Sequence, residues 1–123
     1  MGKRYKVLIV DDSAFTRRMI SSLLVDTEFD VVAEAASGGA AVNEVKTRKP
    51  DLVLLDVIMP DRNGTLVLKD IVDMEPDMRV VMLSSMGTEE VVGECLSLGA
   101  RSFIQKPCDK ETLITHMRKI VNA

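Results

Sequence analysis

Short apolar runs alternate with stripes of apolar residues at helical spacing along all 123 residues of the chain. Five segments are typical of strands: residues 7–10, 29–35, 52–55, 80–83 and 103–104. The stretches after them repeat apolar residues every three or four positions, which predicts five helices. We expect Asp12 or Ser13 to cap the first helix, Gly38 to open the second, Thr65 and Thr88 to start the next two, and Asp109 to cap the last. The pattern therefore predicts five strand–helix units.

This alternation predicts an α/β fold with one domain over residues 1–123. Strands that alternate with helices form a parallel sheet, which the helices cover on both faces. The unbroken apolar run at 52–55 predicts a strand buried in the middle of the sheet. Residues 29–35 alternate instead, with Val31, Ala33 and Ala35 opposite the more polar positions, which predicts an edge strand. The chain contains no repeat or linker that divides it.

Composition narrows the possible partners. A formal net charge of −3 disfavours direct binding to nucleic acid, and no apolar run is long enough to insert into a membrane. The two cysteines, Cys95 and Cys108, have neither metal-site nor disulfide-framework spacing, so we interpret them as reduced thiols of a cytoplasmic protein. The start of the chain lacks the hydrophobic region of a signal peptide.

Polar side chains follow four of the predicted strands where each one ends. Asp11 and Asp12 follow the first, Asp56 the third, Ser84 the fourth and Lys106 the fifth. The carboxyl ends of parallel strands share one edge of a sheet, so we expect three carboxylates to converge there. Their repulsion favours a bound divalent cation, and Mg²⁺ suits a site of few carboxylates and water. With the ammonium and hydroxyl groups nearby, the set predicts phosphoryl transfer onto Asp56.

Four stretches resemble the receiver domain of two-component response regulators over essentially the whole chain. They are Val-Asp-Asp-Ser at 10–13, Leu-Asp-Val-Ile-Met-Pro at 55–60 with Gly64, Ser-Ser at 84–85 and Lys-Pro at 106–107. The chain is most similar to chemotaxis regulators of the CheY type, through 11–18, Ser-Ser-Met-Gly at 84–87 and Gly-Ala-Arg-Ser-Phe-Ile at 99–104. The resemblance implies a flavodoxin-like sheet with strand order 2-1-3-4-5; CheY is itself a standard example of that order.

The resemblance also implies a metal-dependent phosphoacceptor site. Asp56 matches the phosphoacceptor, and Asp12 and Asp56 match the direct Mg²⁺ ligands. Asp11 is expected to act mainly through a metal-bound water. The backbone carbonyl of Ile58 matches the third protein ligand, so its apolar side chain does not forbid metal binding.

Further matches imply a switch. Lys106 matches the lysine that contacts the phosphate, Ser84 the hydroxyl that moves toward it, and Phe103 the aromatic residue that rotates between exposed and inward positions. Phe103 replaces the tyrosine of the best-known members, which removes a phenolic hydrogen bond. Cys108 stands where an aromatic residue commonly follows Lys-Pro. Two apolar side chains beside the site, Ile58 and Met86, differ from the polar residues of many fast-hydrolysing members.

We therefore expect a signalling domain that takes a phosphoryl group from a histidine kinase and binds a downstream protein target. It promotes its own phosphorylation and dephosphorylation rather than acting as an enzyme on a separate substrate. The alternative is the receiver part of a longer regulator, such as a CheB-type methylesterase or a transcription factor. Asp11-Asp12 would repel the phosphate of a flavodoxin-type cofactor, and neither Asp11 nor Asp56 begins the DxD motif of a haloacid-dehalogenase-type phosphatase.

Three other features are expected to have structural roles. Arg17-Arg18 is interpreted as a solvated face of the first helix, and His116 as a surface position on the last helix. Cys95, among apolar neighbours, is interpreted as a small core or surface thiol rather than a nucleophile.

Overall fold

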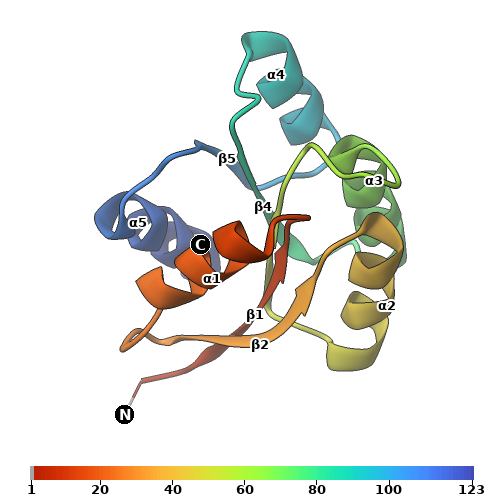
Figure 1. Cartoon of the computed structure of the whole chain (residues 1–123). Coiled ribbons are helices and arrows are strands. Elements are labelled where there is room, and N and C mark those ends of the chain that lie inside the picture. Colours follow the sequence, from red (N-terminus) through yellow and green to blue (C-terminus); the bar gives the residue numbers. More distant parts are fainter. Residues whose placement is uncertain (1) are drawn as a thin grey trace.

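The computed structural model describes residues 2–123, and its five strands form one parallel sheet (Figure 1). In chain order the strands are β1 (Tyr5–Val10), β2 (Phe29–Ala35), β3 (Leu52–Leu55), β4 (Arg79–Ser84) and β5 (Ser102–Gln105). Their order in the sheet is β2-β1-β3-β4-β5, and every neighbouring pair is parallel. The expected fold class and strand order are confirmed, with β2 at an edge.

Five helices follow the strands: α1 (Ala14–Leu23), α2 (Gly38–Arg48), α3 (Gly64–Met74), α4 (Glu89–Ser97) and α5 (Lys110–Val121). The side chain before each helix accepts a hydrogen bond from a backbone N–H of the first turn; these caps are Ser13, Ser37, Asn63, Thr88 and Asp109. The first N–H groups of a helix have no partner within it, so such caps define where a helix begins. Ser13, rather than Asp12, caps α1, and Asp109 caps α5 as predicted.

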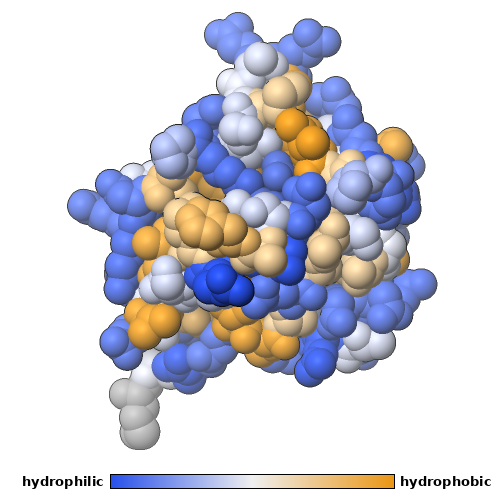
Figure 2. All heavy atoms as spheres, in the orientation of Figure 1, coloured by the Kyte–Doolittle hydropathy of each residue, from blue (hydrophilic) through white to orange (hydrophobic). Residues whose placement is uncertain are grey.

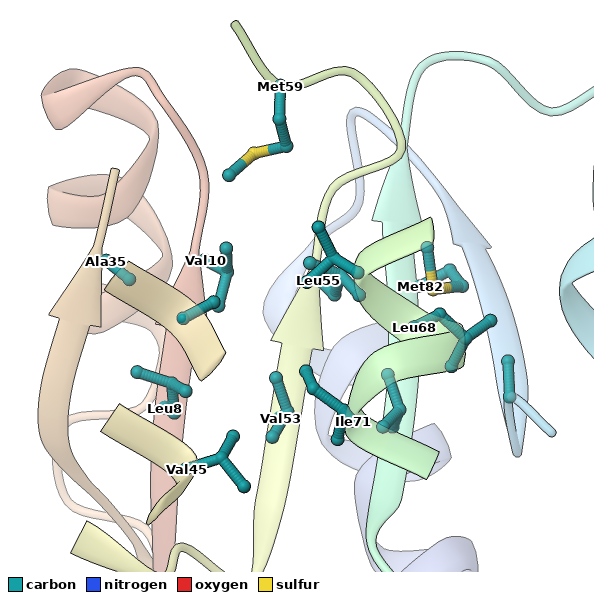
Figure 3. Close-up of a cluster of buried hydrophobic side chains, with 14 of the residues drawn as sticks. Leu8, Val10, Ala35, Val45, Val53, Leu55, Met59, Leu68, Ile71 and Met82 are labelled. Atoms are coloured by element: carbon teal, nitrogen blue, oxygen red, sulfur yellow. The ribbon is translucent and has the colours of Figure 1, made fainter. Parts of the chain in front are cut away.

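The helices cover both faces of the sheet. One core cluster contains side chains of α2, α3 and α4, and Figure 3 shows part of it between the sheet and helices α2 and α3. The second cluster contains side chains of α1 and α5. Within β3, Val53 and Leu55 belong to the first cluster and Leu52 and Leu54 to the second. Burying each such side chain contributes roughly 1.5–3 kcal/mol, so the four-residue run anchors the centre of the fold.

The predicted alternation of β2 is only partly correct. The pairing of β1 with β2 shifts register between Val7 and Leu8, whose partners are Val31 and Ala33. Val31 packs against the α1/α5 cluster, whereas Ala33 packs against the opposite one. An extra residue in a strand exchanges the two faces beyond it, so a two-residue period cannot be followed through this irregularity.

Helix α1 also departs from a simple apolar stripe. Phe15 is 71% exposed and Met19 is 44% exposed, although both belong to that stripe. Figure 2 shows apolar side chains on the surface over α1, the helix at the front of Figure 1. Within the predicted stripe, Ile20 of α1 and Leu24, the residue that caps its C-terminus, are buried against the sheet. In the part of the chain described here, no helix combines the length and apolar character needed to cross a bilayer.

Candidate functional site

The carboxyl edge of the sheet brings the predicted acids together. Val10 of β1 pairs with Leu55 of β3, so the next residues, Asp11 and Asp56, leave the sheet side by side. The Asp56 N–H donates to the Val10 carbonyl at 3.1 Å and extends the ladder by one step. One carboxylate oxygen from each of Asp11, Asp12 and Asp56 lies within 4.8 Å of the other two. Strand register therefore produces the convergence that was expected from the strand ends.

Lys106 reaches this cluster from the end of β5. Its Nζ donates to Asp11 Oδ2 at 2.5 Å and to Asp56 Oδ2 at 3.2 Å. Asp11 is 2% exposed and Asp56 is 9% exposed, so both carboxylates need a partner of opposite charge. Burial alone would lower the pKa of the Lys106 ammonium, but the hydrogen bonds and charges of the two acids outweigh burial and raise that pKa. Lys106 is therefore held in its charged form.

The remaining oxygens of the two buried acids accept backbone hydrogen bonds. The Ser13 N–H donates to Asp11 Oδ1 at 2.9 Å, and the Ile58 N–H donates to Asp56 Oδ1 at 3.3 Å. Asp12 is exposed at the rim of the cluster. One ammonium faces three carboxylates, which leaves an excess of negative charge on a set of oxygen donors. Such a donor set fits a hard divalent cation.

The loop that follows Asp56 is shaped by a close backbone approach. The Gly64 N–H donates to the Val57 carbonyl at 2.5 Å. A Cβ at Gly64 would overlap the carbonyl oxygen of Asp56 and lie 2.6 Å from the Cα of Val57. Only glycine allows α3 to start this close to β3. The side chain of Ile58, which lies in the loop between β3 and α3, is exposed.

Within residues 2–123, the side chains of Ser84 and Phe103 form no hydrogen bond with the charged cluster. Ser84 ends β4 and is fully buried, and its Oγ accepts from the Met86 N–H at 3.2 Å. The Lys106 N–H donates to the Ser84 carbonyl at 2.9 Å, which joins the ends of β4 and β5. Phe103 is half-buried and packs against the α2–α4 cluster. The switch roles of both residues remain predictions.

Three side chains have roles that the sequence pattern did not reveal. Arg17 donates from Nη1 to the Asp11 carbonyl at 2.6 Å, so its assignment to the solvated face is wrong, whereas Arg18 is exposed as expected. Asp61 accepts from the N–H groups of Gly38 and Gly39. The Gln105 amide donates to the Ser85 carbonyl at 2.9 Å. The partners of these side chains lie in other parts of the fold, so local sequence spacing does not predict the contacts.

The residues given structural roles are placed as follows. Cys95 is buried in the α2–α4 cluster, where burial raises the pKa of its thiol, as expected for a core cysteine. His116 is half-buried on α5, with Nδ1 3.1 Å from the Ser102 hydroxyl. Cys108 is half-buried and precedes the Asp109 cap of α5. Neither cysteine is part of the charged cluster.

Residues 7–118 match the family model described as response regulator receiver domain. The chemotaxis protein CheY of Bacillus subtilis is 40% identical over 118 residues, which cover 96% of this chain and 98% of that protein. The CheY chain in a crystal structure of a CheX–CheY–BeF3–Mg complex from Borrelia burgdorferi is 34% identical, with a TM-score of 0.93 over 98% of this chain and 91% of that chain.

A longer protein also matches. The protein-glutamate methylesterase/protein-glutamine glutaminase of B. subtilis is 41% identical over 105 residues, which cover 83% of this chain but 29% of that protein. The match to the CheY protein of B. subtilis extends over nearly the full length of both aligned chains and favours the CheY type. The chain belongs to the response regulator receiver domain family and is a receiver of the CheY type.

Proposed function

We propose that this protein is a phosphorylation-controlled signalling switch in which Asp56 accepts a phosphoryl group from a phosphohistidine of a partner kinase. The observation that carries the proposal is the position of Asp56 at the carboxyl end of the central strand, where it contacts Lys106 Nζ and lies close to the acids Asp11 and Asp12. Asp56 is 9% exposed and so retains a small accessible area, through which a donor can approach.

In the transfer step, a carboxylate oxygen of Asp56 attacks phosphorus and forms the O–P bond while the P–N bond of the donor breaks. The electron pair of the broken bond stays on the imidazole nitrogen, which is protonated as it leaves. Lys106 Nζ, already 3.2 Å from Asp56 Oδ2, is placed to hold a phosphoryl oxygen by charge.

The acidic cluster supports a Mg²⁺ requirement. Asp12 and Asp56 would hold the ion directly, Asp11 through water, and the backbone carbonyl of Ile58 would complete the protein ligands. When bound, Mg²⁺ supplies positive charge that neutralises the phosphoryl oxygens. A CheY relative from B. burgdorferi was crystallised in a complex with BeF3 and Mg²⁺, which supports the proposed Mg²⁺ requirement.

The response is proposed to pass through Ser84 and Phe103 to the surface of α4, β5 and α5. In the structure the Ser84 hydroxyl is bonded to the Met86 N–H within its own loop. Recruitment of that hydroxyl by a phosphoryl group would bias the position of the loop and the rotamer of Phe103. The phosphoryl group can shift this equilibrium only by its differential affinity for the two states.

The full-length similarity to CheY proteins supports a cytoplasmic place in chemotaxis for this chain, with a histidine kinase as donor and a protein as target. The CheX–CheY complex shows that one relative also binds a further protein. Transfer is promoted by the receiver itself, and the protein is proposed to act as a signalling domain rather than as an enzyme. The same site would serve the alternative, a receiver attached to a methylesterase, which the match to that longer protein supports.

The test is labelling of Asp56 by phosphoramidate, a small donor with the same type of P–N bond as phosphohistidine. We expect Mg²⁺-dependent addition of one phosphoryl group to the wild type and none to Asp56→Asn, measured by intact-protein mass spectrometry. Asp73→Asn, on the exposed side of α3, is the matched control and should label normally. Undiminished labelling of Asp56→Asn would rule out Asp56 as the acceptor.

A further inference from the structure

The guanidinium of Arg17 connects three elements beside the acidic cluster. From α1, Nη1 donates to the backbone carbonyl of Asp11 at 2.6 Å, and Nε donates to Glu34 Oε1 of β2 at 2.9 Å. The Arg17 side chain is only 16% exposed, although it carries a full charge. A half-buried cation beside a cation-binding cluster does not favour metal binding through its charge, so any support that Arg17 gives the site has to come from its geometry.

That geometry centres on the peptide bond between Asp11 and Asp12. The Asp11 N–H donates to the Ala35 carbonyl at 3.0 Å, and Arg17 holds the Asp11 carbonyl oxygen. A peptide group is planar, so fixing this oxygen also fixes the nitrogen and the Cα of Asp12. Asp12 itself is exposed, and its carboxylate accepts none of the hydrogen bonds found in residues 2–123. Its direction toward the cluster is therefore set through the backbone.

We propose that Arg17 is a positioning residue for the metal site: it fixes the Asp11–Asp12 peptide so that the carboxylate of Asp12 faces those of Asp11 and Asp56. Glu34 holds the guanidinium in the orientation that this contact requires. The inference rests on the proposed Mg²⁺ site. The planar guanidinium donates in two fixed directions at once, to the carbonyl and to the carboxylate, which an ammonium on a flexible stem cannot reproduce.

The central experiment is Arg17→Lys, which keeps the charge and removes the planar fork. Titration calorimetry with Mg²⁺ alone, at constant ionic strength and without a phosphodonor, measures the metal affinity directly. Loss of groups that orient metal ligands commonly weakens affinity by about 10- to 100-fold, and we expect a loss of about tenfold here. An unchanged affinity in a folded Arg17→Lys protein would overturn the proposal.

A second pair of variants separates the effect of Arg17 geometry on Mg²⁺ affinity from the effect of its charge. Arg18 is the next residue, is exposed, and forms no ion pair within residues 2–123, so Arg18→Gln measures the through-space effect of removing one positive charge. That variant should bind Mg²⁺ as tightly as the wild type or slightly more tightly. Arg17→Gln removes the same charge but should bind Mg²⁺ more weakly. Tighter binding by both glutamine variants would contradict the positioning role.

Glu34 provides a measurement that leaves Arg17 intact. Glu34→Gln and Glu34→Ala lose the same charge, but the glutamine oxygen can still accept from Nε of Arg17. We expect Mg²⁺ to bind more weakly to Glu34→Ala than to Glu34→Gln, and equal affinities would count against the proposal. A wild type that binds no Mg²⁺ would overturn the metal site and this inference together, whereas the labelling of Asp56 tests the phosphoacceptor separately.

Discussion

The β1–α1 corner and the β4–α4 loop both border the site, but they are held very differently. At the first, Asp11 engages its N–H, its carbonyl and both carboxylate oxygens in contacts with other residues. At the second, residues 85–90 are all exposed. Within residues 2–123, the side-chain hydrogen bonds of this loop are those of Ser84 with the Met86 N–H, of Gln105 with the Ser85 carbonyl and of the Thr88 cap. Segments with few buried contacts open at low free-energy cost.

This difference suggests that the β1–α1 corner binds the metal and phosphoryl groups, whereas the β4–α4 loop changes conformation. The charged corner must hold its ligands in one arrangement, because metal and phosphoryl binding depend on geometry. The loop must have a second arrangement within a small free-energy difference, because a switch needs two states that a phosphoryl group can bias. The predictions below test this contrast, from the largest expected effect to the smallest.

The largest effect, on the stability of the fold, is expected at Gly64, where α3 starts close to the end of β3. In Gly64→Ala the new methyl group overlaps backbone atoms of Asp56 and Val57, which cannot move aside like the end of a side chain. We expect the free energy of unfolding to fall by about 3 kcal/mol or more, as for other severe backbone clashes. Urea denaturation followed by circular dichroism measures it. Gly93→Ala, where a Cβ would meet nothing within 4 Å, should leave stability unchanged or raise it by up to about 1 kcal/mol.

A change in the β4–α4 loop should abolish the effect of phosphorylation on target binding, but not phosphorylation itself. Ser84→Ala removes the hydroxyl but no charge, so labelling of Asp56 by phosphoramidate should continue while the change in target affinity is lost. Lys106→Ala removes the ammonium that contacts Asp56 and should impair labelling itself. Binding of the target with and without phosphorylation distinguishes the two. Ser85→Ala, at the exposed neighbouring position, is the control and should keep the normal rise in target affinity on phosphorylation. A normal rise in Ser84→Ala as well would contradict a role of the Ser84 hydroxyl in coupling.

The lifetime of the phosphorylated form depends on side chains of both loops. Ile58 is 53% exposed and Met86 is 41% exposed, and neither can position water strongly for attack on the acyl phosphate. We expect Ile58→Asn, Met86→Glu and the double variant to dephosphorylate faster, by roughly tenfold, or about 1.4 kcal/mol in barrier. Phosphate release at saturating Mg²⁺ measures the rates. Equal or slower rates in all three would show that these side chains do not limit hydrolysis.

The smallest effect concerns Asp61, which ties the β3–α3 loop to the start of α2. Its hydrogen bonds from the Gly38 and Gly39 N–H groups lower its pKa below the ordinary value of 3.8. A lowered pKa in the folded state contributes stability above that ordinary value, and the contribution is lost as the pH falls through the folded-state pKa. Asp61→Asn should therefore lower the Tm slightly at neutral pH, with the difference from wild type shrinking below about pH 4. Asp77→Asn is the exposed control, and a pH-independent difference would contradict this assignment.

Local sequence determined where most elements begin and which residues end the strands. The run at 52–55 is apolar on both faces, and Asp109 caps α5, because burial on two faces and unpaired first-turn N–H groups are local requirements. Asp11, Asp56, Ser84 and Lys106 could therefore be assigned to one edge before any distance was known. The resemblance to receiver domains then supplied the strand order and the roles of these residues.

Only the tertiary structure decided how those residues meet. Asp11 and Lys106 are 95 residues apart, and the 2.5 Å contact between them depends on the register of three neighbouring strand pairs. The register shift between Val31 and Ala33 reversed the faces of β2, and the packing of α1 left Phe15 exposed. Arg17 and Arg18 are adjacent residues of the same type, yet one supports the Asp11 carbonyl and the other lies in solvent. A local pattern specifies the periodicity of an element, whereas a side chain's partner depends on how separate elements pack together.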